Sequence, residues 1–535
     1  MTPSFDLAVV GAGFAGSLTA LIARRLGLSV ALIERGRHPR FAIGESSSPL
    51  ANLLLEELAD RYALPRIRPL AAWGSWRRDY PGIGCGLKRG FTFYAHARGK
   101  PFAADPERRD QLLVAASPCD EVADTHWYRP DFDAFLAREA ETAGAAYSDQ
   151  TELSVAARGG GGGGATLEAR RGNARWTLSA RLVVDASGPG GFLHRAFELP
   201  AARFAGLPDT ESLYAHLTGV RRLDALPIFR SEEPPPYPVD DAAVHHVFEG
   251  GWIWVLRFGN GIVSAGVAAT PVLARELRLD EGEAAWHRLL ALLPTVAEQF
   301  TGAEAATRWR HRRPMPFRTG AAAGPGWTML PSAAAFVDPL LSTGFPLTLL
   351  GIERLASALR DDWGTPAFDA RLQADAATTL AEADTAAALV AALYAHFGDF
   401  EVFAALTQLY FAAASYAEAA RRLGRRELSG SFLSGTHPVF GPAFAACTRL
   451  AFARDPARRR ELLDAIARAV EPLDVIGLSD LSRRNWYPVL SEDLLAARRK
   501  LGATREEIEA MLRATMPAAP VTSGDGASRA LTPSR

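Results

Sequence analysis

Gly11-Ala12-Gly13-Phe14-Ala15-Gly16 decides the fold of this chain, together with the apolar run from Phe5 to Val10 that leads into it. A short apolar run of this kind is typical of a buried parallel strand. Ser17 to Gly27 has helical spacing and ends at a glycine, and Ser29 to Ile33 has the pattern of a second strand, followed by Glu34. Together these segments predict one βαβ unit, which begins a Rossmann-type domain.

The glycine pattern and Glu34 have the chemistry of a site for an ADP-bearing cofactor. Gly11 allows a tight turn, Gly13 lets the backbone approach a pyrophosphate, and Gly16 permits close contact between helix and strand. Free N–H groups at the helix N-terminus attract phosphates, and a carboxylate at Glu34 can accept the ribose hydroxyls. The predicted cofactor-binding residues of this unit are Gly11, Ala12, Gly13, Phe14, Ala15, Gly16, Glu34 and Arg35.

Three loops further along the chain favour FAD over NAD as that cofactor. Gly44-Glu45-Ser46 follows the second strand and offers a flexible glycine, a hydroxyl and amides suited to an isoalloxazine ring. Asp185-Ala186-Ser187-Gly188 and Phe336-Val337-Asp338-Pro339 add two loops at spacings typical of large flavoproteins. Gly44, Glu45, Ser46 and Asp338 are therefore predicted to contact the cofactor.

Length and composition predict a multidomain enzyme of ordinary globular character. The 535 residues exceed one minimal core, and 48% apolar with 22% charged residues is the profile of a globular enzyme. The formal net charge of -1 gives no general attraction to nucleic acid or to an anionic membrane. The three cysteines are widely spaced, and neither a signal-like N-terminus nor a long uncharged apolar run is evident, so we expect a cytoplasmic protein.

The order of segments predicts an α/β fold class. A Rossmann-type (GR2-like) FAD-binding domain is interleaved with an antiparallel-sheet substrate domain and followed by a helical C-terminal region. We expect the FAD-binding domain over 1–200, with a substrate-side insertion at about 65–125, and a return to it over 311–360. The substrate domain is predicted over 201–310, the helical region over 361–516 and a disordered tail over 517–535. The glycine run at 159–164 is interpreted as a hairpin tip, with a phosphate-binding loop as the alternative.

Four segments resemble the flavin-dependent halogenase family, within the p-hydroxybenzoate-hydroxylase-like flavoprotein superfamily. The resemblance covers roughly residues 5 to 350, and the helical C-terminal part matches only loosely. One of the segments, Gly251-Trp252-Ile253-Trp254, is similar to the family's WxWxIP element. The other three are Lys88-Arg89-Gly90-Phe91-Thr92-Phe93, the loop from Asp185 to Leu193, and Asp338-Pro339-Leu340-Leu341-Ser342-Thr343-Gly344.

The resemblance implies roles for individual residues. Lys88 maps onto the family's catalytic lysine, and Arg129 resembles an arginine near the cofactor. Thr343 and Gly344 correspond to residues whose backbone amides bind halide beside the flavin, and Gly344 is also expected to contact the cofactor. The residues expected in the substrate pocket are Trp252, Trp254 and Phe93.

The activity implied by the resemblance is the halogenation of an electron-rich aromatic ring by hypohalite, which reduced flavin and dioxygen generate from halide. It implies FAD as the cofactor, chloride or bromide, a separate flavin reductase, and a small aromatic substrate that is either free or tethered to a carrier protein. Lys88 would guide the hypohalite by hydrogen bonding or as a haloamine, and burial would lower the pKa of Lys88 and favour the haloamine. Leu341 stands where tryptophan halogenases have a glutamate, so a phenol- or pyrrole-type substrate is implied rather than free tryptophan.

Two departures from the family pattern keep other functions open. Val255-Leu256-Arg257 replaces the end of the WxWxIP element, and Pro331-Ser332 replaces a Gly-Asp pair before the last flavin loop. Both favour the alternative of a FAD-dependent dehydrogenase or ene-reductase of the geranylgeranyl-reductase type, without halide chemistry. A flavin-bound scaffold without catalysis is a third interpretation.

Several candidate residues also have an ordinary structural explanation. Lys88 could be a surface lysine at a strand edge, the halide-binding amides could hold a flavin carbonyl instead, and the tryptophan pair could be core packing. His245 and His246 point to opposite faces of a strand without nearby carboxylates, so no metal site is predicted. The arginines from Arg308 to Arg313 are interpreted as a solvated face, with an acidic substrate or a carrier protein as the alternative.

Overall fold

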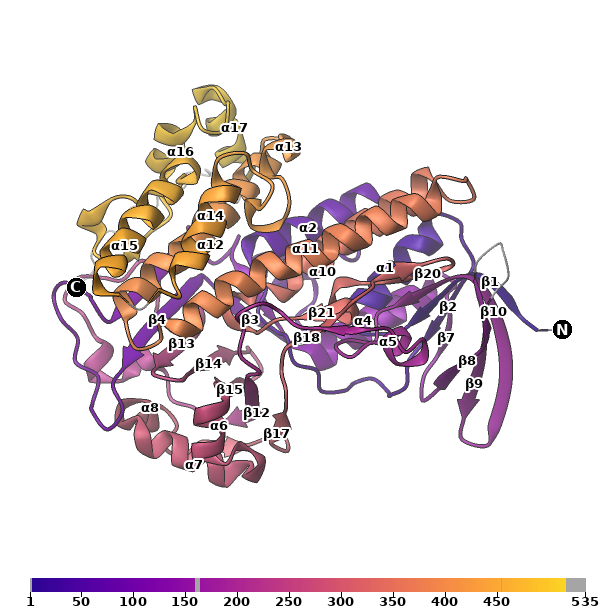
Figure 1. The fold of residues 1–535 in the computed structure, drawn as a ribbon, viewed down its shortest axis with the longest axis horizontal. Coiled ribbons are helices and arrows are strands. Elements are labelled where there is room, and N and C mark those ends of the chain that lie inside the picture. Colours follow the sequence, from indigo (N-terminus) through magenta and orange to yellow (C-terminus); the bar gives the residue numbers. More distant parts are fainter. Residues whose placement is uncertain (1, 159–163, 454, 516–535) are drawn as a thin grey trace, which may run out of the picture.

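The computed structural model describes residues 2–158, 164–453 and 455–515, and these form three parts (Figure 1). One sheet with its helices lies at the N-terminal end of the molecule, a second sheet lies at the opposite end, and the C-terminal helices pack above the second sheet. The predicted hairpin tip at 159–164 lies outside the described residues except for Gly164, and so does the predicted disordered tail at 517–535.

The first sheet contains the predicted βαβ unit. Its main path runs β19-β20-β10-β1-β2-β7, and the four pairings from β20 to β7 are parallel, while β19 pairs antiparallel with β20. The hairpin of β8 and β9 extends this sheet by pairing antiparallel with β10. The strands are β1 (Ser4–Val10), β2 (Val30–Ile33), β7 (Ala146–Ser148), β8 (Glu152–Arg158), β9 (Ala165–Arg171), β10 (Ala174–Asp185), β19 (Ala323–Gly324) and β20 (Trp327–Met329).

Tight packing at the end of β1 explains the glycine pattern. The first helix, α1 (Phe14–Arg25), packs against α4 (Arg129–Thr142) and α10 (Gly344–Asp361). A Cβ on Gly16 would lie 1.9 Å from the carbonyl oxygen of Gly11, and Gly11 itself has a φ of +99°. Only glycine therefore lets the helix begin this close to the strand.

The second sheet is mainly antiparallel, and its main path runs β16-β12-β15-β14-β13-β4-β5-β22, with β17 paired to β12. The pairings of β13 with β4 and of β5 with β22 are parallel. The strands are β4 (Gly90–His96), β5 (Gln111–Ala115), β12 (Glu211–Thr218), β13 (Ala243–Phe248), β14 (Gly251–Arg257), β15 (Val263–Ala269), β16 (Glu304–Ala305), β17 (Arg310–Arg312) and β22 (Trp486–Tyr487).

This sheet draws on more of the chain than the predicted substrate domain. Strands β4 and β5 come from the segment predicted as an insertion, and β22 comes from the region predicted to be helical. The segment 201–310 alone leaves the β13 edge unpaired, and β4 supplies the missing hydrogen bonds. Two smaller sheets join β3 (Cys85–Lys88) with β6 (Asp124–Trp127), and β11 (Ala201–Ala202) with β18 (Phe317–Thr319) and β21 (Ala335–Phe336).

The helices after β21 pack over both sheets. In Figure 1, α10 and α11 run along the first sheet, and α12 continues toward the second. Phe411 of α12 contacts Phe91 of β4 edge-on, with ring centroids 5.2 Å apart. The remaining helices are α2 (Pro49–Arg61), α3 (Trp73–Asp79), α5 (Phe192–Ala196), α6 (Pro271–Leu277), α7 (Glu283–Leu292), α8 (Pro294–Gln299), α9 (Pro331–Ala334), α11 (Phe368–Ala395), α12 (Phe400–Arg422), α13 (Arg426–Ser429), α14 (Phe440–Leu450), α15 (Pro456–Val470), α16 (Ser491–Ala497) and α17 (Arg505–Thr515).

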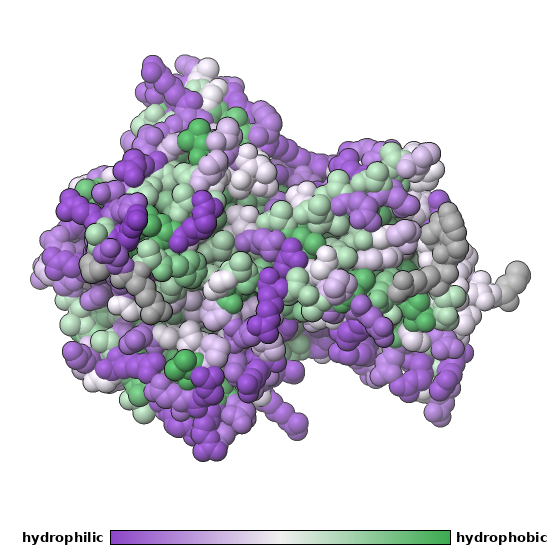
Figure 2. All heavy atoms as spheres, viewed as in Figure 1, coloured by the Kyte–Doolittle hydropathy of each residue, from purple (hydrophilic) through white to green (hydrophobic). Residues whose placement is uncertain are grey.

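Helix α11 is, within the described part of the chain, the one helix long and apolar enough to cross a membrane. It packs against α10, α12 and α14, and 61% of its most apolar window is buried inside the protein. On the face shown in Figure 2, hydrophilic side chains cover the helices of the second sheet and the β8–β9 hairpin, while apolar side chains are more frequent along the middle of the molecule. The packing of α11 is therefore that of a core helix.

Candidate active site

A cleft of about 290 Å³ opens at the carboxyl ends of β1 and β10, and we call it the cofactor cleft. Ligands of open α/β sheets bind at this edge. Its walls combine the start of α1 with the loop around Gly44, the loop after β10 and the start of α10. Of the residues predicted from sequence, those that line it are Gly13, Phe14, Ala15, Gly44, Arg129, Asp338, Thr343 and Gly344.

Other predicted cofactor residues lie behind this lining. Glu34 is buried, and its carboxylate accepts the N–H groups of Ala12 at 2.9 Å and Gly36 at 2.7 Å. Burial opposes ionisation of Glu34, but Arg40 and these N–H groups outweigh it and lower the pKa of the carboxyl. Glu34 thus holds the turn that carries the glycine pattern, while the side chain of Arg35 is exposed to solvent.

Arg129 fastens the Gly44 loop to the first domain. Its guanidinium forms a two-pronged ion pair with Asp133 at 2.7 and 2.8 Å and donates to the carbonyl oxygen of Gly44 at 2.8 Å. The adjacent Glu45 carboxylate lies 2.7 Å from Nε2 of His216 on β12. The loop is therefore held from both sheets, which fixes one wall of the cofactor cleft.

The lining of the cofactor cleft fits an anionic dinucleotide. Arg40, Arg129 and Arg312 all face it, and the buried Nε of Arg312 makes no hydrogen bond to any residue that the structure describes. A Cβ on Gly188 or on Gly344 would meet no atom within 4 Å, so the backbone at both positions borders open space. Cationic groups and exposed glycine backbone are the features that a pyrophosphate and a flavin ring require.

A smaller cavity of about 90 Å³, the inner pocket, continues from the Gly44 and Gly344 side of the cleft. Trp252 and Trp254 both face it from β14, as their alternation predicts, and their rings lie 5.7 Å apart. Asp338 borders the same space, and burial raises the pKa of Asp338 to about 7 although the N–H of Leu340 and the hydroxyl of Tyr394 bond to it. The inner pocket therefore has aromatic walls and, in Asp338, a buried acid whose pKa is raised toward neutral pH.

Lys88 is buried between cavities and does not lie at the surface. Its side chain is fully buried, its Nζ donates to the carbonyl oxygen of Ser47, and the amine sits 3.7 Å from the ring centre of Phe91. Burial lowers the pKa of Lys88 to about 7, against the attraction of Asp124, which raises it. Lys88 itself lines neither the cofactor cleft nor the inner pocket; the nearest link is Ser47, which accepts its hydrogen bond and follows Ser46 of the inner-pocket lining.

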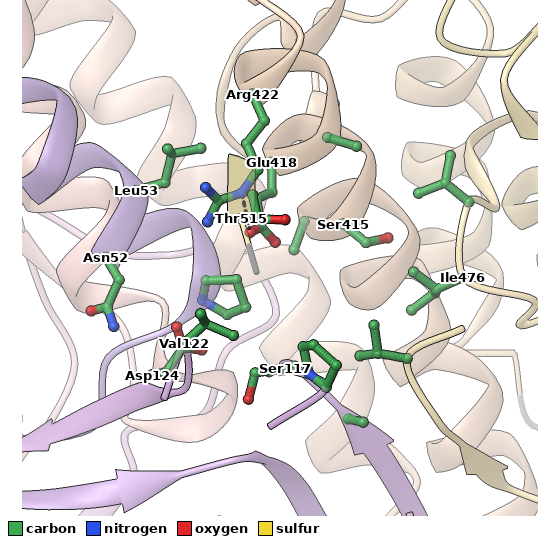
Figure 3. A pocket seen from close by; sticks show the side chains of 18 of the residues that line it. Asn52, Leu53, Ser117, Val122, Asp124, Ser415, Glu418, Arg422, Ile476 and Thr515 are labelled. Carbon is green, nitrogen blue, oxygen red and sulfur yellow. Dashed lines mark hydrogen bonds and ion pairs between the residues drawn. The ribbon is translucent and has the colours of Figure 1, made fainter. Parts of the chain in front are cut away.

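On the other side of Lys88 lies a cavity of about 290 Å³, which we call the helical cavity (Figure 3). Phe91 and Asp124 line it, and these are the ring beneath the Lys88 amine and the strand partner of Lys88 in the β3–β6 ladder. Its other walls come from α2, β5, α12 and the segments around Ile476 and Thr515. Lys88 thus contacts residues that line this second, mostly apolar cavity without lining it itself.

Sequence reasoning missed four residues of these cavities. Asp124, Asn52 and Ser117 belong to the helical cavity, and no motif marks them because they come from separate elements. Arg312 was grouped with a solvated face, but it is partly buried in the cofactor cleft, so that interpretation is wrong for this residue. Strand alternation offered the signal, since β17 turns alternate side chains toward opposite faces.

Phe93 and His246 line none of these cavities, whereas His245 borders the inner pocket. Phe93, expected in the substrate pocket, instead packs in the core with its ring stacked 4.3 Å from that of His245, because α12 covers this face of β4. His246 points to the opposite face and contacts His96 at 2.9 Å and Gln299 at 2.9 Å. Within the described ranges, no group of three His, Cys, Asp or Glu residues is placed to hold a metal ion.

A known family matches the part of the chain that supplies the first half of the cofactor cleft, up to Ala335. The sequence model described as FAD dependent oxidoreductase (DAO) matches residues 6–335, which is more than half of the chain. The chain therefore belongs to the FAD-dependent oxidoreductase family, with FAD as its cofactor.

Within that family the chain is similar to halogenases. It is 29% identical to monodechloroaminopyrrolnitrin halogenase PrnC of Pseudomonas fluorescens, over 68% of this chain and 63% of that protein. It is also 29% identical to tetracycline 7-halogenase of Kitasatospora aureofaciens, over 67% of this chain and 64% of that protein. The matches thus span less than two thirds of the length of these two relatives.

Solved structures have the same fold. The crystal structure of halogenase PltM in complex with phloroglucinol and FAD matches with a TM-score of 0.78 and 24% identity, over 90% of this chain and 99% of that chain. The flavin-dependent brominase Bmp2 matches with a TM-score of 0.56 and 20% identity, over 90% and 97%. The α/β fold class with an FAD-binding domain is confirmed, and the chain is a divergent relative of the flavin-dependent halogenases.

Proposed function

We propose that this enzyme halogenates an electron-rich aromatic ring of phenol or pyrrole type, with a separate flavin reductase supplying reduced flavin. The observation that carries the proposal is the buried amine of Lys88, which bonds to Ser47 beside the inner-pocket lining and lies over Phe91 of the helical-cavity lining. A hydride-transferring reductase needs no such amine beyond its flavin. The similarity to halogenases that act on several aromatic scaffolds supports the same reaction class.

FAD, when bound and reduced, would supply two of the four electrons that reduce dioxygen, and halide would supply the other two as it becomes hypohalous acid. The residues of the chain would then confine the product, hypohalous acid, and direct it. Lys88 is the group for this task, because an amine with a pKa of about 7 is available near neutral pH either as a hydrogen-bond donor or as a nucleophile for halogen. The substitution joins ring carbon to halogen and releases the ring proton with hydroxide as water, so it needs no further oxidant.

The inner pocket would hold halide and exclude bulk water. Thr343 and Gly344 stand at the start of α10, where an 18-residue helix presents its positive end. Trp252 and Trp254 close the opposite side with apolar surface, which limits the loss of hypohalite to water. The helical cavity, on the far side of Lys88, would receive the aromatic substrate, either free or carried on a partner protein.

Turnover with a reductase tests this proposal. FAD-loaded protein is supplied with a flavin reductase, NADH, oxygen, bromide and a panel of phenols and pyrroles, and products are read by the bromine isotope pair in mass spectra. We expect brominated product from the wild type. Lys88→Met keeps the buried volume but removes the amine, so product should fall about 100-fold or more.

Lys100→Ala is the matched control, because Lys100 is exposed and far from either cavity, and its product yield should equal that of the wild type. FAD content and thermal midpoint are measured for each variant to verify folding. Product without halogen, or bromination that survives Lys88→Met, contradicts the proposal. Direct reduction of the bound FAD by NADPH, with halide-free product, would instead support the reductase alternative.

A further inference from the structure

Resting on the proposed function, we propose that Asp124 recognises the substrate. It accepts a hydrogen bond from a ring O–H or N–H, so that the helical cavity selects phenols and N–H heteroaromatics over their methylated counterparts. The unpartnered polar atoms around this cavity carry the inference, and none of the sequence motifs includes them.

Asp124 is a buried acid without a complete set of partners. Only 5% of the residue is exposed, and its Oδ2 makes no hydrogen bond to any residue in the described part of the chain. Its backbone pairs with that of Lys88, which places the carboxyl beside the proposed halogen-transferring amine. Buried polar groups in folded proteins are almost always bonded, so an orphaned acid that borders a cavity points to a ligand.

Two further polar groups around the same cavity lack partners. Both side-chain amide atoms of Asn52 and the hydroxyl of Ser117 make no hydrogen bond to the described residues, although these residues are only 4% and 3% exposed. Figure 3 shows Asn52 on α2 and Asp124 on its strand along one side of the cavity, with Ser117 at another side. A ligand with more than one polar substituent would satisfy all three residues.

The rest of the lining suits a flat, uncharged ring. Phe91, Val114, Tyr410 and Phe411 provide apolar walls. The three aromatic rings among these side chains can pack against an aromatic ligand edge-on or in an offset stack. The cavity volume of about 290 Å³ gives room for a substituted aromatic ring.

The charges that face Asp124 leave it as the free acceptor. Glu418 and Arg422 of α12 bind each other at 2.9 Å, and Lys88 donates to Ser47. Burial raises the pKa of Asp124 to about 8, against the opposing attraction of Lys88, so the acid is mostly uncharged near neutral pH. An uncharged acid both accepts and donates a hydrogen bond, which matches a phenol and disfavours a charged ligand.

Binding without turnover tests the proposal independently of halogenation. Oxidised, FAD-loaded enzyme is titrated by calorimetry with resorcinol against 1,3-dimethoxybenzene, and with pyrrole against N-methylpyrrole, in the absence of reductase. We expect the O–H or N–H member of a pair to bind about tenfold more tightly, the effect of one hydrogen bond to a buried acceptor. Asp124→Leu should abolish this preference.

Two variants separate recognition from packing. Ser415→Ala is the matched control, because Ser415 lines the same cavity but its hydroxyl already donates to the carbonyl oxygen of Phe411 at 2.7 Å, so the preference should remain. Asp124→Asn keeps an acceptor oxygen and should retain the preference. The amide does not ionise, so the preference of this variant should not change above pH 8, where the wild-type acid becomes charged. Equal binding within both pairs, or a preference that survives Asp124→Leu, overturns the proposal. A preference that holds in an enzyme without halogenation leaves this inference standing and removes the proposed function.

Discussion

The cofactor cleft and the helical cavity have the same volume, about 290 Å³, yet they are built in different ways. Glycine backbone, helix starts and arginines form much of the cleft, and its main loops directly follow β1, β2 and β10. The helical cavity is formed by side chains from α2, β4, β5, β6, α12 and the last helices. A site made of backbone depends on a few positions where only one residue fits, whereas a site made of side chains can change residue by residue.

The largest expected effect comes from the backbone-built site. Gly16→Ala places a methyl group 1.9 Å from the carbonyl oxygen of Gly11, so the start of α1 must move away from β1. We expect a loss of about 4 kcal/mol or more of stability and loss of bound FAD, measured by thermal unfolding and flavin absorbance. Gly82→Ala is the control, since a Cβ there meets nothing within 4 Å, and similar losses in both variants would contradict the comparison.

A second large effect is expected at the clamp of the Gly44 loop. Arg129→Leu leaves Asp133 buried without its cation, which should cost about 3 kcal/mol and weaken FAD binding. Arg66→Leu is the control, because it also removes an arginine that pairs with an acid of α4. Arg66 is 64% exposed and its guanidinium lies 2.8 Å from the carboxylate of Glu139. That variant should change stability by less than about 1 kcal/mol, and equal effects in the two variants would show that the clamp is unimportant.

A medium effect is expected from the boundary between the two cavities. If the free amine of Lys88 is the reactive form, the rate of halogenation should rise about tenfold between pH 6 and pH 8, because the lowered pKa of about 7 puts deprotonation in that window. A halogenation rate that falls between pH 6 and pH 8 would indicate that the ammonium form of Lys88 is the reactive one. As a control for the flavin steps, the hypohalite that escapes into solution is captured by an added small-molecule trap and measured at each pH.

Asp124→Asn sharpens that pH experiment. Asp124, in the fraction of molecules in which it is ionised, raises the pKa of the Lys88 amine, although burial of the amine dominates and lowers that pKa. Without this carboxylate, the rising limb should move to lower pH. A limb that stays in place, or moves upward, would mean that the observed titration belongs to another group.

The smallest effect is expected at Arg312. This arginine is partly exposed at the cofactor cleft, so its attraction to a bound anion is screened. Arg312→Leu should weaken FAD binding by about fivefold at low salt and by less at high salt, as measured by equilibrium dialysis. A loss independent of salt would indicate a packing role instead.

The sequence predicts the parts of the molecule whose conformation depends on residues close together along the chain. The βαβ unit follows from two apolar runs and three glycines, and Gly11 and Gly16 have in the structure the close contacts that their spacing implies. The placement of Trp252 and Trp254 on one side of a strand follows from the period of two. Each of these predictions needs only neighbours along the chain.

The parts that escaped prediction depend on contacts between distant segments. Asn52, Asp124 and Ser117 meet only because α2, β6 and the loop after β5 converge beneath α12, and no spacing in the sequence encodes that meeting. Strand β22 joins the second sheet from a region with helical patterning, because the edge of β5 offers it hydrogen bonds. Phe93 was assigned to the substrate pocket but packs in the core, because the cover that α12 provides on β4 cannot be predicted from β4 alone.

The last four described residues that border the helical cavity are Met511, Leu512, Ala514 and Thr515, on α17, and with the stretch from Val475 to Leu494 they touch none of the cofactor cleft. Residues 475–515 therefore contribute to the wall of the helical cavity and to none of the cofactor cleft, although β22 within them also pairs with β5. Exchanging this segment between related chains should therefore change which aromatic substrate is accepted, while the cofactor cleft stays unchanged.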